Sequence, residues 1–105
     1  MGKINNKEIL EYRRLLFEYE YDLATKSLNR VQKNEIKAGL KDLYDIVSNL
    51  SFKKEEDIIE REDLLADIAI NVAYDLSRGN ERREWEDIAL YHSSNIKNVK
   101  SEVNK

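Results

Sequence analysis

The most apolar stretch of the chain runs from Glu60 to Gly79, and its hydrophobic residues recur at the spacing of an α-helix. On a helix, these side chains would cover more than half of the circumference, and polar residues would gather on the remaining strip. The apolar positions are Ile58, Leu64, Leu65, Ile68, Ala69, Val72, Ala73 and Leu76, and the polar ones are Glu60, Asp63, Asp67 and Asn71. A helix with so wide an apolar face needs several neighbours, so we expect it to be the central structural helix.

The packing and the end of this central helix are both marked in the sequence. Ala66, Ala69 and Ala73 fall close together on one flank, where small side chains would let another helix approach closely. Gly79 follows the last periodic residues and can adopt the left-handed conformation that ends a helix, with the cation of Arg78 in the last turn. We therefore expect a tight packing seam and a helix end near Arg78.

The first helix is predicted to have two apolar stripes. It should begin at Asn5 or Asn6, because either side chain can cap a helix. One stripe is Ile9, Tyr12, Leu16, Tyr19 and Leu23, and the other is Phe17, Tyr21, Ala24, Leu28 and Val31. Each stripe alternates steps of three and four residues, so we expect this helix to touch two neighbours.

Arg13, Glu20 and Ser27 lie between these two stripes. If that face is buried, the two charged residues need partners, since an unpaired buried charge is costly. Two outcomes remain open: Arg13 and Glu20 set the register of an oligomer, or their long side chains reach solvent at the rim.

The hydrophobic phase changes after Val31, which indicates a break at residues 32–34, either a loop or a kink. Asn34 would then cap the second helix, and Gly39 within it marks a weak point or a close contact. The new stripe is Ile36, Leu40, Leu43, Val47 and Leu50. Ser51 would cap the central helix, with Phe52 packed over the junction.

The fourth helix should follow a tight reversal at Gly79 and Asn80, with Asn80 as its cap. Its narrow stripe is Trp85, Ala89, His92, Ile96, Val99 and Val103, with Ile88 alongside. This pattern predicts an antiparallel hairpin with the central helix, but residues 93–95 have low helix propensity and leave its continuity open. The tail beyond Asn98 is expected to be flexible.

Composition favours one all-α domain. The 105 residues include no Pro and three Gly, and 41% are hydrophobic and 37% charged, which is typical of amphipathic helices. We expect a four-helix, mostly antiparallel bundle with short connections, with helices at about 6–32, 35–50, 54–78 and 81–98. The first and third helices would be longest, and their extra turns would leave apolar surface for a homodimer.

Several classes of protein are excluded by simple absences. The chain has no Cys, and its N-terminus, MGKINNKEIL, has no long apolar segment of the kind found in secretory signals, so a cytoplasmic location is expected. No apolar run approaches the roughly 18 residues that a membrane span needs. The richness in Lys, Asn and Ile suggests a bacterial, phage or plasmid source.

The net charge of -3 is concentrated between Glu55 and Asp67, where seven acidic residues face only Arg61. An acidic first turn that suits the helix dipole explains this density. A docking surface for a basic partner is the alternative.

No motif for catalysis, a cofactor or a metal is present. His92 is the single His, and Ala89 stands three residues before it, so neither a Glu-x-x-His pair nor a two-His site can form. Ser93 and Ser94 would project away from His92 on a helix, which argues against a nucleophilic site. We expect a satisfied, buried histidine with a structural role, and no enzymatic activity.

The best basic patch is Arg78, Arg82 and Arg83, with Trp85 close by. Acidic residues surround this patch, and an acidic domain gains little from counterion release on nucleic acid. A small nucleic-acid-binding regulator that uses these arginines is therefore the alternative function.

Protein binding is the leading expectation. Leu15 projects from the polar side of the first helix, and Leu90 and Tyr91 lie off the stripe of the fourth. Together with Arg82 and Arg83, these residues are the candidate contacts with a protein partner or with a second copy. The sequence thus predicts a non-enzymatic binding module of the inhibitor, adaptor or immunity type. Its size and acidic, helical character broadly resemble bacteriocin immunity proteins and small phage accessory proteins.

Overall fold

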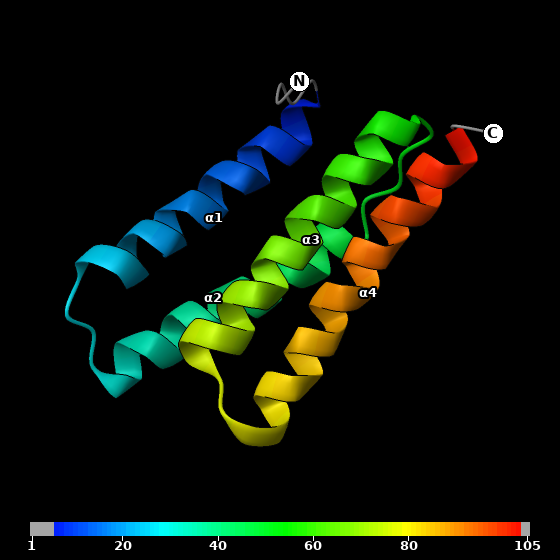
Figure 1. The fold of residues 1–105 in the computed structure, drawn as a ribbon. Coiled ribbons are helices and arrows are strands. Elements are labelled where there is room, and N and C mark those ends of the chain that lie inside the picture. The colour runs from blue at the N-terminus through cyan, green and yellow to red at the C-terminus, as the bar shows by residue number, and fades with distance from the viewer. Residues whose placement is uncertain (1–5, 104–105) are drawn as a thin grey trace.

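The computed structural model describes residues 6–103, with side chains to residue 100, and shows an all-α bundle (Figure 1). The helices of this part are α1 (Lys7–Thr25), α2 (Arg30–Ser48), α3 (Glu55–Leu76) and α4 (Gly79–Val103). Short connections join them, so successive helices run antiparallel, as predicted. Within residues 6–103, no helix has the length and hydrophobicity needed to cross a membrane.

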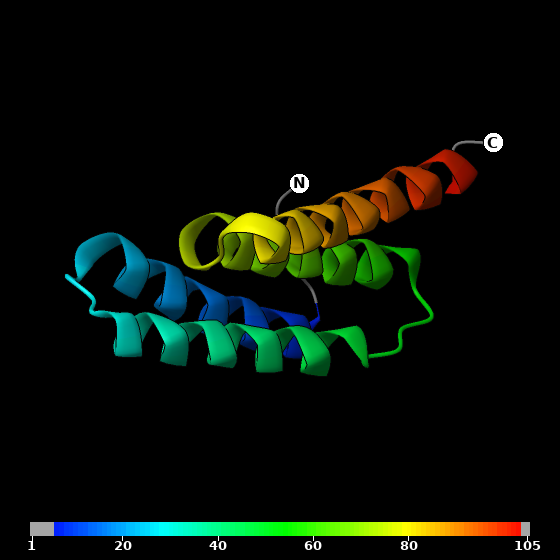
Figure 2. The same cartoon turned by 90° about the horizontal axis from the view of Figure 1, so that it is seen from below.

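The bundle consists of two stacked hairpins. Figure 2 shows the α1–α2 hairpin in one layer and the α3–α4 hairpin in the other. α3 packs against α1, α2 and α4, whereas α1 and α4 do not pack against each other in the described part of the chain. On the side of α3 that lies between α1 and α4, no further helix of the described chain covers the bundle (Figure 1).

α3 provides the centre of the hydrophobic core, as its wide apolar face predicts. The core cluster combines side chains of three helices: Ile9, Leu16, Ile36, Leu40, Leu43, Val47, Leu64, Leu65, Ile68 and Val72. Phe52 packs against this cluster from the connection before α3, as expected. α3 begins at Glu55 after Lys54, which gives no side-chain cap, so the expected capping role of Ser51 is wrong.

The alanine flank of α3 is the seam with α4. Ala66, Ala69 and Ala73 are buried, and they follow Glu62 on the same side of the helix. Glu62 contacts His92 of α4, which places this flank against that helix. Small side chains allow the two backbones to approach, which explains why α3 and α4 form the most extensive helix pair.

The first two helices differ from the prediction at their junction. α1 begins after Asn6, whose side chain accepts hydrogen bonds from the backbone of Glu8 and Ile9 at 3.0 and 3.3 Å; Asn5 lies outside the described residues. α1 ends at Thr25 instead of near residue 32, and α2 starts at Arg30 instead of residue 35. The break is a loop, so Asn34 lies inside α2.

Asn29 explains the early start of α2. Its side chain accepts from the backbone of Gln32 at 2.8 Å, and the Gln32 side chain accepts from the backbone of Asn29 at 2.9 Å. This capping box satisfies backbone donors that the first turn of a helix leaves free. α1 and α2 have the same length, and α4 is longer than α3, so the expectation that the first and third helices are the longest is wrong.

The α3–α4 junction also differs. Gly79 has the predicted left-handed backbone, with φ of 60°, but it opens α4 instead of closing α3, which ends at Leu76. Asn80 therefore lies within α4 and does not cap it. α4 continues through residues 93–95 to Val103, past the expected start of the tail at Asn98; residues 104–105 lie outside the described part.

Glu81 links the first turn of α4 to α2 through ion pairs. Its carboxylate accepts hydrogen bonds from the ammonium groups of Lys37 and Lys41. These two hydrogen bonds lower the pKa of Glu81 from 4.5 to about 2. Because the folded pKa lies below the unfolded one, this pairing stabilises the fold above pH 4.5 and is lost as the pH falls toward 2.

We expect Glu81→Gln to lower the melting temperature at pH 6 and to lose this effect as the pH falls toward 2. Thermal melts of both proteins between pH 6 and pH 2 measure the difference. The Glu84→Gln variant is the control, because Glu84 is an exposed carboxylate of the same helix. A difference between wild type and Glu81→Gln that stays constant across this range would contradict the assignment.

Candidate protein-binding site

Arg13 and Glu20 hold α1 against α3. Arg13 donates to Asp67 at 2.6 Å and to Asp63 at 3.1 Å, and Asn71 donates to Glu20 at 2.9 Å. Both residues thus have the partners that buried charges require, and these partners lie within the chain, across α1 and α3. Burial and the neighbouring Asp67 raise the pKa of Asp63, although Arg13 opposes the shift.

The first apolar stripe of α1 packs into the bundle. Ile9 and Leu16 are fully buried, and Tyr12, Tyr19 and Leu23 pack against the same cluster. Tyr19 lies over Gly39 of α2, where an added Cβ would fall 2.9 Å from the ring carbon Cζ. Gly39 is therefore a close-contact position, one of the two roles expected for it.

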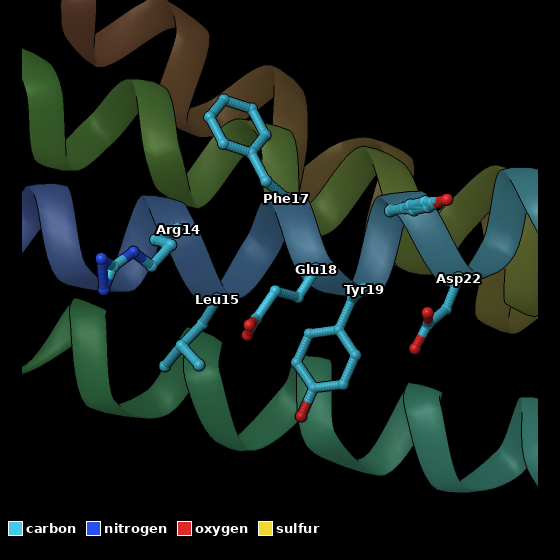
Figure 3. A pocket seen from close by; sticks show the side chains of 7 residues that line it. Arg14, Leu15, Phe17, Glu18, Tyr19 and Asp22 are labelled. Carbon is cyan, nitrogen blue, oxygen red and sulfur yellow. The ribbon is translucent and has the colours of Figure 1, made fainter.

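α1 touches α2 and α3, the two neighbours expected for it, but its second apolar stripe is left largely exposed. Phe17 and Tyr21 are 57% and 58% exposed, and Leu10, about two turns before Phe17 on the same side, is exposed as well. Leu10 stands three residues before Arg13, and Phe17 and Tyr21 stand four and eight residues after it. Because Arg13 pairs with α3, these three residues lie on the flank of α1 next to α3. Figure 3 shows Phe17 pointing toward the side of α3, away from α2.

α3 adds two apolar side chains beside this stripe. Ile70 is 42% exposed, and Tyr74 is exposed one turn later on the same strip. The Tyr74 hydroxyl donates to Glu86 of α4 at 3.1 Å, and the guanidinium of Arg82 lies 4.6 Å from the centre of the Tyr74 ring. The strip therefore faces the gap between α1 and α4.

We call this surface the open face. It consists of Leu10, Phe17 and Tyr21 of α1 and Ile70 and Tyr74 of α3, with Arg82 and Glu86 along the edge that α4 forms. Exposed apolar residues that occur singly are ordinary, but a group on the facing flanks of two neighbouring helices is typical of an interaction site. The pairs of Arg13 with Asp63 and Asp67 lie at the boundary between the two flanks.

The predicted contact residues do not form one surface. Leu15, Leu90 and Tyr91 are all exposed, as predicted. Leu15 points toward α2 (Figure 3), whereas Leu90 and Tyr91 lie on α4, which does not pack against α1. The Tyr91 ring lies 5.0 Å from that of His92, and its helix position places it on the side of α4 away from the open face. Leu90 follows Glu86 by four residues and lies on the same side of α4 as Arg82 and Glu86.

Seven residues of α1 line a shallow hollow of about 590 Å³ (Figure 3). They include Leu15 and Tyr19, which point toward α2, and Phe17, which points to the opposite side of the helix. One helix cannot enclose a ligand, so we do not consider this hollow a built site.

The predicted basic residues are only partly brought together. Arg78 and Arg82 line a cleft at the end of the bundle where α3 meets α4, together with basic residues of α2. Arg83 is exposed and is not among the residues that line this cleft.

His92 is buried in a polar network between α2, α3 and α4. Its Nδ1 lies 3.1 Å from Oε1 of Glu62, and its Nε2 lies 2.7 Å from the hydroxyl of Tyr44. Asn95 donates to Glu62 at 2.6 Å, and Arg61 donates to its other oxygen at 3.2 Å. Each polar group of this network therefore has a partner, which a buried group requires.

The pKa shifts define how the protons are arranged in this network. Burial and the charge of Glu62 raise the pKa of Tyr44, so its hydroxyl keeps its proton. Burial alone would raise the pKa of Glu62, but hydrogen bonds from Asn95 and His92 outweigh it and lower the pKa. The ionised Glu62 can only accept, so His92 donates to it from Nδ1. This arrangement locks three helices together.

Sequence reasoning did not identify the open face. It placed Phe17 and Tyr21 on an apolar stripe, but periodicity alone does not show whether such a stripe is covered by a neighbouring helix. No group of three or more acidic or histidine side chains suited to a metal ion occurs among the described residues. Comparison with protein-family models, with curated proteins and with solved structures finds no match to this chain.

Proposed function

We propose that this chain is a non-enzymatic protein-binding module of the inhibitor, adaptor or immunity type, and that its open face accepts an amphipathic helix of a protein partner. The observation that supports the proposal is the exposed second stripe of α1. Phe17 and Tyr21 recur at helical spacing, as residues that pack on another helix do, yet each is more than half exposed.

The shape of the open face suits a helical partner. α1 and α4 flank the exposed strip of α3, so a helix laid along this strip would contact all three. Apolar residues of the incoming helix would meet Phe17 and Ile70, and its polar side would meet the charged edge formed by Arg82 and Glu86. Aromatic and Arg side chains of this kind are the usual centres of binding energy.

A pair of charge substitutions tests the proposal. Phe17→Glu and Ile70→Glu each place a carboxylate in the middle of the open face, and we expect each to abolish recovery of the partner in an affinity purification from the native host. The matched control is Tyr91→Glu, which makes the same change at an aromatic residue of similar exposure that lies on the other side of α4, outside the face. Circular dichroism verifies that all three variants remain folded.

Two outcomes would reject the proposal. Loss of the recovered proteins with Tyr91→Glu but not with Phe17→Glu would place the contact elsewhere. Light scattering that shows a dimer at micromolar concentration, converted to a monomer by Phe17→Glu, would assign the open face to a second copy of the chain. A monomer at high micromolar concentration would instead rule out the homodimer expected from the sequence.

A further inference from the structure

A basic cleft of about 820 Å³ lies at the end of the bundle where α2 begins and α4 begins. Residues from α2, from the end of α3, from the α3–α4 turn and from the first turn of α4 line it. Five of them are cationic, namely Arg30, Lys33, Lys37, Arg78 and Arg82, and two are carboxylates, Asp75 and Glu81. The cleft is thus positive in a chain whose net charge is -3.

Three of the five cations are available to a ligand. Lys37 is paired with Glu81, and Arg82 is paired with Glu86 and lies over the ring of Tyr74. Arg30, Lys33 and Arg78 take part in none of the ion pairs found among the described residues. The guanidinium groups of Arg30 and Arg78 can each bind phosphate oxygens in a bidentate manner.

The first turn of α4 adds backbone donors to the cleft. Arg78 occupies the capping position of this 25-residue helix, since its carbonyl accepts from the backbone of Arg82 at 3.4 Å. An Arg side chain has no acceptor and cannot cap the free N–H groups of the first turn. Such groups, together with the positive end of the helix dipole, favour an anion.

Ser77 provides an independent indication of a ligand. It lines the cleft, is only 7% exposed, and its buried hydroxyl has no hydrogen-bond partner among the described residues. Leaving a buried hydroxyl unpaired is unfavourable, so native structures usually provide a partner. Because its Oγ is itself buried, this hydroxyl must rotate toward the cleft before a phosphate oxygen can accept from it.

We propose that the basic cleft binds the phosphate groups of a small oligophosphate ligand, with Arg30, Lys33 and Arg78 as the cationic contacts and Ser77 as a hydroxyl donor. The volume of the cleft is that of a small-ligand site. An extended nucleic acid fits less well, because Glu84, Glu86 and Asp87 follow along α4 and would repel its backbone. The cleft adjoins the open face at Tyr74 and Arg82 but does not depend on it.

Isothermal titration calorimetry of the full chain with tripolyphosphate at low ionic strength tests this inference. We expect saturable binding that Arg30→Ala, Arg78→Ala and Ser77→Ala each weaken about tenfold, since each removes a hydrogen bond to a charged group. The matched control is Arg83→Ala, an exposed arginine next to Arg82 that does not line the cleft. Phe17→Glu, which alters the open face, is expected to leave binding unchanged.

Three results would overturn the inference. They are no binding at millimolar tripolyphosphate, an equal loss in Arg83→Ala, and tight binding of duplex DNA with none of tripolyphosphate or a nucleoside triphosphate. The last result would support the nucleic-acid reading of the same arginines. Tighter binding of a nucleoside triphosphate than of tripolyphosphate would support the cleft and show that it also contacts a base or sugar.

Discussion

Replacement of Ile68 by alanine is expected to lower the free energy of unfolding by about 2–5 kcal/mol. Ile68 is fully buried on α3, within a core cluster that includes side chains of α1, α2 and α3. Because α3 packs on all three other helices, no neighbour can move inward to fill the space without losing contacts of its own. The substitution therefore removes transfer free energy and leaves a cavity.

Urea denaturation of wild type and variant measures this loss. Ile70→Ala is the control, because it is the same substitution on the same helix at a residue that is 42% exposed. A surface substitution usually changes stability by less than about 0.5 kcal/mol. Equal losses for Ile68→Ala and Ile70→Ala would contradict both the central position of α3 and the exposure of the open face.

Replacement of Glu62 by alanine should cost about 3 kcal/mol or more, although Glu62 is a charged residue that adds nothing to the apolar core. Its carboxylate accepts hydrogen bonds from His92, Asn95 and Arg61. His92 and Glu62 are each only 5% exposed, so water cannot replace the lost acceptor of the imidazole without opening the α3–α4 seam.

Two further variants isolate this cause. Glu62→Gln keeps a carbonyl acceptor for His92 and Asn95, so we expect a smaller loss than for alanine. Glu56→Ala removes an exposed carboxylate one and a half turns earlier on α3 and should change stability by less than about 0.5 kcal/mol. If Glu62→Ala is no more destabilising than Glu56→Ala in urea denaturation, the buried network is not structural.

The all-α architecture and the central position of α3 could be predicted because both follow from residue periodicity. Ala66, Ala69 and Ala73 indicated a close-packed seam for the same reason, because small residues at helical spacing allow another helix to approach. The structure identifies that helix as α4. Continuity of α4 through residues 93–95 could not be predicted from propensity. Asn95 donates to Glu62 on another helix, and such a contact overrides the low local preference.

The end of α1 was missed because the second stripe continues in phase from Phe17 to Val31 across the loop that separates α1 from α2. The deciding signal was local and polar: Asn29 and Gln32 have the spacing of a capping box. The continuous apolar periodicity instead favoured a break between α1 and α2 at residues 32–34, several residues after the actual loop.

The pairs that define the candidate sites join residues far apart in sequence. Arg13 meets Asp63 and Asp67, and Arg30 shares a cleft with Arg78, only because the two hairpins stack. A single sequence contains no record of such contacts. The exposure of Phe17 and Tyr21 depends equally on the absence of α4 from their side, which is a property of the topology.

Site-specific photocrosslinking in the native host tests the central claim most directly, namely that the open face contacts a protein partner. Benzoylphenylalanine would replace Phe17, Tyr74 or Tyr91, one position in each variant. The account predicts the same heterologous adduct from positions 17 and 74 and none from position 91. An adduct from position 91 alone, or no adduct from position 17, would contradict it.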